Sequence, residues 1–326
     1  MSRWRKIWYL PLEYNDMRPT SCFDREIRAY LEGCGSDFCV INFPELDNAG
    51  IKKGSFLDAP TTIQVKMQQL SVLAYRYGSG QITDDDLIFT QDIWFPGLTA
   101  IPYLNYFCKV RPQLRGLLHA GTFTDTDFVR QLERWGAMFE NCLFDIVDKV
   151  FVASDFIRDD VLQKRLCSPD KIEATGWPND YYGVDQYKSL REEKEELVVF
   201  CARNVDEKQP WKFEKLADRL RFFGAEFINT QAQNLSREQY YMVLNRAKVI
   251  VSFALQENFG HAIMEAVHAG CIPIVPDRCA YPEFYPDEYR FRDFDECVEK
   301  VMMALSGTLP RIPAPVFPDA VKRWFE

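Results

Sequence analysis

The sequence contains no C-x-x-C pair, only three histidines in 326 residues, and no apolar run approaching the ~18 residues of a membrane-spanning helix. Without paired cysteines and with so few histidines, a structural zinc site is not expected. The start, MSRWRKIWYLPLEYND, lacks a hydrophobic stretch of signal-peptide length. We therefore expect a cytoplasmic protein whose ten cysteines are reduced thiols.

The chain also has no excess of positive charge. The 39 Lys and Arg residues are outnumbered by 48 Asp and Glu residues, which gives a net charge of −9. This charge favours solubility but does not favour a nucleic-acid or anionic-membrane surface. Two local basic clusters are exceptions. One consists of Arg3, Arg5 and Lys6, and the other consists of Lys109, Arg111 and Arg115.

Short apolar runs alternate with amphipathic stretches along the chain. Ser236 and Gln239 have the spacing of a capping box, and the apolar residues of 128–139 share one helix face. Nearly continuous apolar strands separated by helices are typical of parallel sheets covered on both faces. The predicted strands are 6–12, 38–43, 87–90, 116–119, 150–154, 197–202, 226–229, 249–253 and 272–275.

A segment rich in Gly, Pro, Asn and charged residues, GWPNDYYGVDQYKSLREEKEE, separates two series of strands. Two such series predict an α/β fold with two Rossmann-like, doubly wound domains that face each other across a cleft. We place the first domain at 1–180 and the second at 181–308. A proline-rich tail with a closing helix follows at 309–326.

The stretch at 249–277, VIVSFALQENFGHAIMEAVHAGCIPIVPD, is the most informative about chemistry. A buried strand is predicted to end near Phe253 and a helix to begin near His261. Gly260 at the turn allows the backbone to approach a ligand, and the free N–H groups of the helix suit a diphosphate. The carboxylates of Glu257 and Glu265 can each accept hydrogen bonds from vicinal hydroxyls, one pair on a sugar and one on a ribose.

This stretch resembles the Glu-x7-Glu motif of retaining GT-B glycosyltransferases, especially family 4, with E-x-F-G before the helix and E-A-x-x-x-G along it. The resemblance covers 196–293 well and the rest of the chain in outline. It implies a retaining hexosyl- or pentosyltransferase that uses a nucleoside-diphosphate sugar as donor. It also implies no metal, no cofactor and no side-chain nucleophile, because the leaving phosphate helps to take the acceptor's proton.

The resemblance also implies roles for individual residues. Glu257 would contact the donor sugar and Glu265 the nucleotide ribose. Arg203 and Lys208, five positions apart, would neutralise the departing diphosphate, although Ala202 stands where the family commonly has glycine. An alternative is that these two charges are solvated at a strand end. The other implied donor contacts are Phe259, Gly260 and His261 along the sugar and diphosphate, Thr230 and Gln231 at the base, and Glu283 in a closing loop.

The first half departs from the family, because PLEYNDMRPTSCFDRE replaces its glycine-rich turn. Glu13, Arg18 and Thr20 follow the first predicted strand, at the carboxyl edge where such sheets bind ligands. Asp92 and His119 are expected at the same edge. By resemblance, His119 is a catalytic contact, and the alternative is a core imidazole. Asp92 either orients an acceptor hydroxyl or caps the next helix.

The acceptor is predicted to be soluble, with no membrane partner, because no basic amphipathic stretch of the lipid-modifying kind is present. The runs PLEYNDMRPT, IWFPG and HAGTFTDTD are similar to glycosyltransferase-like proteins of bacteriophages, some of which modify hydroxymethylated pyrimidines in DNA. This resemblance suggests DNA as acceptor, in the host-cell cytoplasm. Such an enzyme needs a basic rim and an extruded base. The two basic clusters, with Trp4, Trp94 and Phe95 near them in sequence, are candidates.

Several alternatives stay open at this stage. The acceptor could be a small molecule, a glycan or a protein, and the chain could be a sugar-nucleotide epimerase or an inactive GT-B-like binding module. Asp125, Thr126 and Asp127 match the D-x-D metal motif of GT-A glycosyltransferases, but aspartates at a helix start explain them more simply. The sequence does not identify the donor sugar, its base or the oligomeric state.

Overall fold

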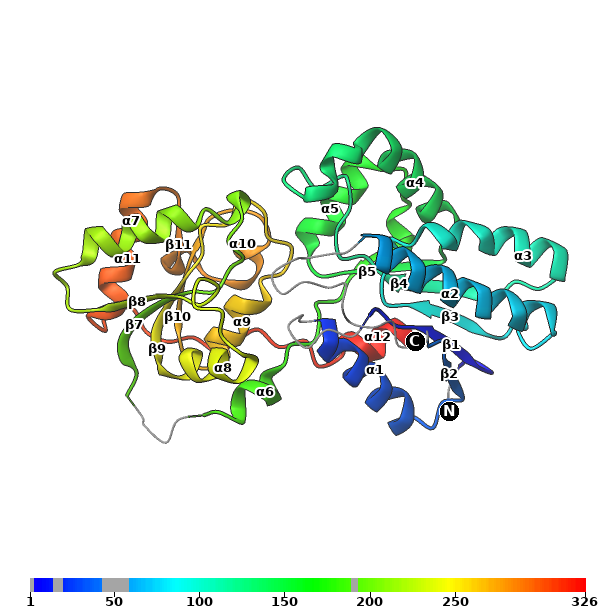
Figure 1. Cartoon of the computed structure of the whole chain (residues 1–326), viewed down its shortest axis with the longest axis horizontal. Helices are drawn as coiled ribbons and strands as arrows, with labels where there is room; N and C mark the ends of the chain where they lie inside the picture. Colours follow the sequence, from blue (N-terminus) through cyan, green and yellow to red (C-terminus); the bar gives the residue numbers. More distant parts are fainter. Residues whose placement is uncertain (1–2, 14–19, 43–58, 189–192) are drawn as a thin grey trace. The chain divides into compact units, whose positions relative to one another are not determined.

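The computed structural model describes residues 3–13, 20–42, 59–188 and 193–326. The chain divides into two compact units, Met1–Trp177 with Pro318–Glu326, and Pro178–Phe317 (Figure 1). Each unit has its own cluster of buried apolar side chains. Separate cores are the property expected of separate domains. Within the described ranges, no helix combines the length and the apolar character that crossing a membrane requires.

The first unit contains a six-stranded parallel sheet in the order β2-β1-β3-β4-β5-β6. The four residues of β1 and of β3 are all buried, as expected for strands covered on both faces. All six strands point the same way, so the loops that follow them meet at one edge. The strands are β1 (Ile7–Leu10), β2 (Phe38–Val40), β3 (Leu87–Thr90), β4 (Gln113–Leu117), β5 (Lys149–Val152) and β6 (Ile172–Ala174).

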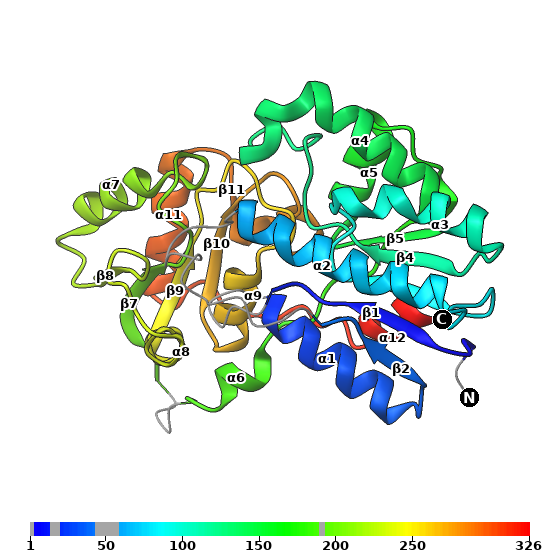
Figure 2. The same cartoon turned by 45° about the vertical axis from the view of Figure 1, so that its right-hand side comes forward.

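The strand order determines which face each helix covers, because parallel crossovers are right-handed. The connection from β1 to β2 moves toward one edge of the sheet, and every later connection moves toward the opposite edge. Accordingly, α1 lies on one side of the sheet and α2 on the other (Figures 1 and 2). The helices are α1 (Thr20–Gly33), α2 (Ala59–Gly78), α3 (Ile101–Cys108), α4 (Glu133–Ile146) and α5 (Asp155–Lys164), with 3-10 turns η2 (Pro96–Ala100), η3 (Phe128–Leu132) and η4 (Pro169–Lys171).

The last helix of the chain, α12 (Ala320–Phe325), covers the face that would otherwise be left to α1 alone (Figure 2). The ring of Trp324 is fully buried and lies 6.1 Å from those of Phe89 in β3 and Phe23 in α1. Its indole N–H donates to Thr175 Oγ1 at 3.0 Å. The carboxyl-terminal helix is therefore part of the core of the first unit.

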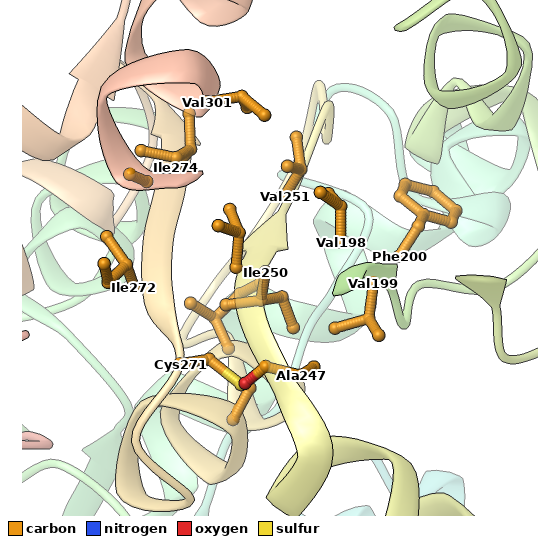
Figure 3. Close-up of a cluster of buried hydrophobic side chains, with 14 of the residues drawn as sticks. Val198, Val199, Phe200, Ala247, Ile250, Val251, Cys271, Ile272, Ile274 and Val301 are labelled. Atoms are coloured by element: carbon orange, nitrogen blue, oxygen red, sulfur yellow. The ribbon is translucent and has the colours of Figure 1, made fainter. Parts of the chain in front are cut away.

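The second unit contains a five-stranded parallel sheet in the order β11-β10-β9-β7-β8. Figure 3 shows its core, in which Ile250 and Val251 lie between Ile274 on one side and Val198 on the other, with Val301 from a covering helix beside Ile274. These aliphatic side chains are buried, as the near-continuous apolar runs predict. The strands are β7 (Glu195–Phe200), β8 (Glu226–Asn229), β9 (Ala247–Val251), β10 (Ile272–Pro276) and β11 (Arg290–Phe291).

Two groups of helices cover this second sheet. α7 (Pro210–Leu220) contacts α11 (Phe294–Leu305), whereas α6 (Tyr181–Asp185), α8 (Arg237–Arg246) and α9 (His261–His268) contact one another. Figure 1 shows the two groups on opposite sides of the strands. The remaining turns are α10 (Tyr281–Phe284), η5 (Asp206–Lys208) and η6 (Asp287–Tyr289).

Most of the predicted elements are present with shifted ends. The strands at 87–90 and 226–229 have the predicted bounds, and the capping box of Ser236 and Gln239 is confirmed. The strand predicted at 116–119 was misplaced, because β4 begins at Gln113 and ends at Leu117, so that His119 lies in the following loop. The short strands β6 and β11 were not predicted.

Replacing Trp324 with alanine should lower the free energy of unfolding of the first unit by about 3–5 kcal/mol, because it removes a fully buried aromatic ring. Trp324→Phe keeps most of the packing and loses the hydrogen bond to Thr175, so it should lower stability by less. Urea unfolding followed by near-ultraviolet circular dichroism measures both. An alanine variant within 1 kcal/mol of the wild type would contradict a core role for α12.

Candidate functional site

The loop between β9 and α9 holds the predicted Glu-x7-Glu stretch. Gly260 is the N-cap of α9 and has φ 88°, a backbone conformation that glycine adopts without strain. A Cβ at this position would lie 3.5 Å from the Tyr281 ring, an ordinary van der Waals distance. The positive φ, and not a lack of space, is therefore what favours glycine here. The helix begins at His261, as the sequence predicts, with its amino end at the carboxyl edge of the sheet.

Glu257 and Lys208 form an ion pair that joins the loop before α9 to the turn before α7. Lys208 Nζ lies 3.3 Å from Glu257 Oε2 and also donates to the carbonyl of Gln256. The other carboxylate oxygen, Oε1, accepts from the Gly260 N–H at 3.0 Å. Burial alone would raise the pKa of Glu257, but Lys208 and the nearby backbone N–H outweigh it and lower that pKa. Glu257 is therefore ionised at neutral pH.

Arg203 lies in the same turn but is more exposed. Its guanidinium is 3.1 Å from Glu207 Oε1, and Lys208 Nζ is 3.8 Å from that same oxygen. The Leu255 N–H donates to the Glu207 carbonyl at 2.8 Å, which ties this turn to the β9–α9 loop. Lys208 thus lies at the amino end of α9 and Arg203 in the adjoining turn, an arrangement that suits an anionic ligand.

The residues at the start of α9 differ in what they expose. Phe259 is buried, with its ring 5.5 Å from Phe284 and 5.2 Å from Phe317, so only its backbone is available to a ligand. His261 Nδ1 lies 2.7 Å from Asn179 Oδ1. Since an amide oxygen only accepts, Nδ1 carries the proton in this contact.

Glu265, the second acidic residue of the motif, is 3% exposed, and both of its carboxylate oxygens accept hydrogen bonds. Tyr240 donates to Oε2 at 2.9 Å, and Arg237 donates to Oε1 at 3.3 Å. Burial raises the pKa of Glu265 to about 7, although Arg237 and Tyr240 act in the opposite direction. Arg237 also lies 3.6 Å from Asp180, so Glu265 belongs to a buried network that joins α8, α9 and the start of α6.

The remaining predicted donor residues lie around the same sheet edge. Thr230 follows β8 and is buried, with its hydroxyl 3.3 Å from the Phe200 carbonyl. Gln231 is exposed, and its N–H donates to Asn229 Oδ1 at 3.1 Å. Glu283 is exposed on α10.

In the first unit, Glu13 follows β1 at the carboxyl edge of the sheet. Its side chain is buried, and Oε1 has no hydrogen-bond partner in the described part of the chain. Thr20 is the first residue of α1, and only its backbone is described. Arg18 lies outside the described residues. A buried carboxylate oxygen of this kind is available to a hydroxyl or amide donor.

His119 contacts the loop that follows β3. Its Nε2 lies 2.7 Å from the Gln91 carbonyl, and its ring lies 4.6 Å from that of Trp177. Because a carbonyl only accepts, Nε2 carries the proton and Nδ1 is the acceptor nitrogen. Burial lowers the pKa of His119, although Asp92 and the Gln91 carbonyl act to raise it. The imidazole is therefore neutral at pH 7.

Asp92 does not cap the next helix, because the N-cap of η2 is Phe95, which has no side-chain cap hydrogen bond. Asp92 Oδ1 accepts from the Trp94 N–H at 2.9 Å, a local turn contact. Its Oδ2 lies 3.6 Å from the buried Lys66 ammonium of α2. Gln91, one residue earlier, joins the loops by accepting from the Leu12 N–H at 2.9 Å. The predicted residues Glu13, Asp92 and His119 are thus on three loops that Gln91 connects.

The D-x-D alternative finds little support in the structure. Asp127 is the N-cap of η3 and accepts from the Val129 N–H at 3.0 Å, while Asp125 pairs with Lys164 at 3.1 Å. Among the described residues, no three His, Cys, Asp or Glu side chains are grouped so as to hold a metal ion.

Solved structures match this architecture along nearly the whole chain. Sucrose-phosphate synthase from Thermosynechococcus elongatus superposes with a TM-score of 0.66 over 99% of this chain and 95% of its own, at 12% identity. The two-domain, parallel-sheet architecture is that of GT-B proteins. The chain has the GT-B fold. The UDP-forming α,α-trehalose-phosphate synthase of Burkholderia vietnamiensis matches with a TM-score of 0.60 over 98% of this chain and 94% of its own, at 11% identity.

A sequence relative matches over a shorter span. The tRNA-queuosine alpha-mannosyltransferase of Drosophila melanogaster is 32% identical over 119 residues, which are 36% of this chain. The match spans only 30% of the length of that relative. No model of a known protein family matches the chain.

Sequence reasoning missed the residues that surround the predicted ones. Arg237, Tyr240 and Tyr241 occupy one face of α8, and Tyr241 donates to Asp180 at 2.8 Å. Their spacing at i, i+3 and i+4 was the available signal, because these positions share a helix face. Asn179, the partner of His261, lies in the segment interpreted as a linker.

The raised pKa of Glu265 predicts a pH-dependent stability. The folded protein holds this proton more tightly than the unfolded chain, so stability from Glu265 falls as pH rises from 4.5 to about 7 and is constant above. The loss is at most roughly 3.5 kcal/mol, since each pKa unit corresponds to about 1.4 kcal/mol. Urea unfolding at several pH values should show this fall in the wild type and a smaller one in Glu265→Gln. Identical pH profiles for the two proteins would show that folding does not change the pKa of Glu265.

Proposed function

We propose that the protein is a retaining, metal-independent glycosyltransferase that uses a nucleoside-diphosphate sugar. The observation that carries this proposal is the pairing of Lys208 with Glu257 at the amino end of α9, with Arg203 in the adjoining turn. This group combines cations, a helix amino end and an ionised carboxylate within one domain. It supports binding of a diphosphate next to a polyol.

The proposed reaction assigns a part to each residue. Glu257 accepts hydrogen bonds from the donor sugar, and Glu265 accepts them from the ribose. The bond from the sugar C1 to the diphosphate breaks, and the acceptor oxygen bonds to C1 on the same face. The acceptor proton passes to the leaving phosphate. Lys208 and Arg203 stabilise the charge that develops on the diphosphate, and this effect is greatest in the transition state.

The first unit would supply the acceptor side. At the carboxyl edge of the sheet, the buried Glu13 carboxylate has an oxygen without a hydrogen-bond partner among the described residues, and the neutral His119 ring lies at the same edge. In this proposal His119 approaches the donor sugar, and Glu13 and Asp92 position the acceptor.

The acceptor that we propose is a hydroxyl on a modified base of a nucleic acid. The Drosophila relative is named for transfer to queuosine in tRNA, which supports a nucleoside acceptor. The similarity of the first half to bacteriophage proteins supports a hydroxymethylated pyrimidine in DNA. Incubating the protein with each nucleic acid and a sugar nucleotide, followed by nucleoside mass spectrometry, separates the two.

Donor binding can be tested without an acceptor. A thermal-shift screen with UDP, GDP, ADP and their sugars should find one nucleotide that stabilises the protein, by about 2.7 kcal/mol at one hundred times its dissociation constant. Glu265→Ala should reduce that stabilisation, because the ribose loses an acceptor. Glu299→Ala serves as a control, since it removes an exposed glutamate of α11, a helix that carries none of the predicted donor residues. If no nucleotide stabilises the wild type, the proposed activity is wrong.

Lys208→Ala should abolish sugar transfer while the protein stays folded, since the leaving diphosphate loses its closest cation. Lys208→Met preserves the length of the side chain and should be equally inactive, which separates charge from packing. Circular dichroism checks the fold, and product nuclear magnetic resonance gives the anomeric configuration. Normal turnover by both variants, or a product of inverted configuration, would refute the proposed mechanism. Conversion of the donor to an epimer without acceptor would instead identify an epimerase.

A further inference from the structure

An aromatic cluster lies at the carboxyl edge of the first sheet, next to Asp92. It consists of Trp94, four residues after β3, Trp135 in the first turn of α4, and Phe139 one turn later; we call these three rings the aromatic platform. The Trp135 ring stacks on Phe139 with centroids 4.8 Å apart and planes at 13°. Trp94 meets Trp135 edge-on at 5.7 Å and 81°.

The platform is held by a buried polar network. The Trp94 indole N–H donates to Glu140 Oε1 at 3.0 Å. Glu140 is 1% exposed and pairs through Oε2 with the Arg165 guanidinium at 2.6 Å, and it also accepts from Thr122. A paired buried carboxylate of this kind has little freedom to move. The Trp94 ring therefore has a fixed orientation in the folded protein.

The position of Trp135 is fixed in a different way. Gly136, the next residue, packs so closely on the preceding loop that a Cβ there would lie 2.3 Å from Thr122 Cγ2. The first turn of α4 is thus held against the loop that follows β4. Despite this, Trp135 remains 43% exposed, and Met138 is 66% exposed. A large ring that is rigidly placed and partly uncovered is typical of a binding surface.

The surroundings of Trp135 favour one kind of ligand. Leu132 and Met138, three positions before and after Trp135, are exposed and apolar, whereas a sugar ring requires hydrogen-bonding partners for its hydroxyls. Arg134, the residue before Trp135, is also exposed and carries a positive charge. A flat base that stacks on an aromatic ring, with a phosphate near a cation, fits this combination.

We propose that the aromatic platform binds the unpaired base of a nucleic-acid acceptor, which stacks on Trp135 while its hydroxyl points to Asp92 and Glu13. This inference rests on the proposed function and adds the residue that would recognise the acceptor. Trp135 is here a binding residue with no part in the donor site. Its loss should therefore raise KM for the acceptor more than it lowers kcat.

The test uses the full chain and two probes, a short single-stranded DNA with one 5-hydroxymethylcytosine and a tRNA anticodon stem-loop containing queuosine. For the probe that the protein glycosylates, Trp135→Ala should raise both the KM and the dissociation constant about tenfold, the size expected for one base–aromatic stack. Fluorescence anisotropy measures the dissociation constant. Trp135→Phe should restore most of the affinity, because it keeps a stacking ring.

A matched control is Tyr106→Ala, which removes an aromatic side chain of α3 in the same unit that is even more exposed than Trp135, at 76% against 43%. It should leave both constants unchanged. Nucleotide stabilisation should be the same in all variants, so a failure of donor binding in the wild type is distinguishable from a failure of this inference. Unchanged acceptor constants in Trp135→Ala, or a wild type that binds nucleotide but neither probe, would overturn the assignment.

Discussion

The ion pair of Lys208 and Glu257 connects two loops on which the candidate donor site depends. Lys208 ends η5, after β7, and Glu257 lies in the loop after β9, and these strands are neighbours in the sheet. The Lys208 ammonium and the Leu255 N–H both bridge the two loops. Because either charge would be poorly solvated alone, each requires the other. The pairing keeps the Glu257 carboxylate ionised beside the amino end of α9.

The parallel sheet explains why such a site can form from residues far apart in sequence. The strands β8, β7, β9 and β10 all point the same way, so Thr230, Lys208, Glu257 and Tyr281 follow strand ends at one edge. The first unit repeats this geometry with Glu13, Asp92 and His119, and Gln91 connects their loops by accepting from Leu12 and from the imidazole. The same rule therefore produces a cationic edge in one unit and an acceptor-rich, aromatic edge in the other.

The sequence predicted the fold and the motif better than the surroundings of the motif. Long apolar strands and the Ser236 capping box are local signals and were found, whereas β11 has only two residues and gives no periodicity. The strand β4 was misplaced because it contains Gln113 and Arg115, which do not read as apolar. Glu257 and Glu265 lie in one motif, but the contacts of Glu265 come from α8, and no local pattern links the two helices.

The contacts of Glu265 also bear on how it would serve a ligand. Each carboxylate oxygen can accept more than one hydrogen bond, so donation from Tyr240 and Arg237 leaves room for ribose hydroxyls. Those same donors orient the carboxylate, and Arg237 in turn is held by Asp180. A pKa near 7 means that the charge of Glu265 is only weakly favoured in the buried site. Hydrogen bonds from a bound ribose would favour that charged form, and binding and ionisation would then reinforce each other.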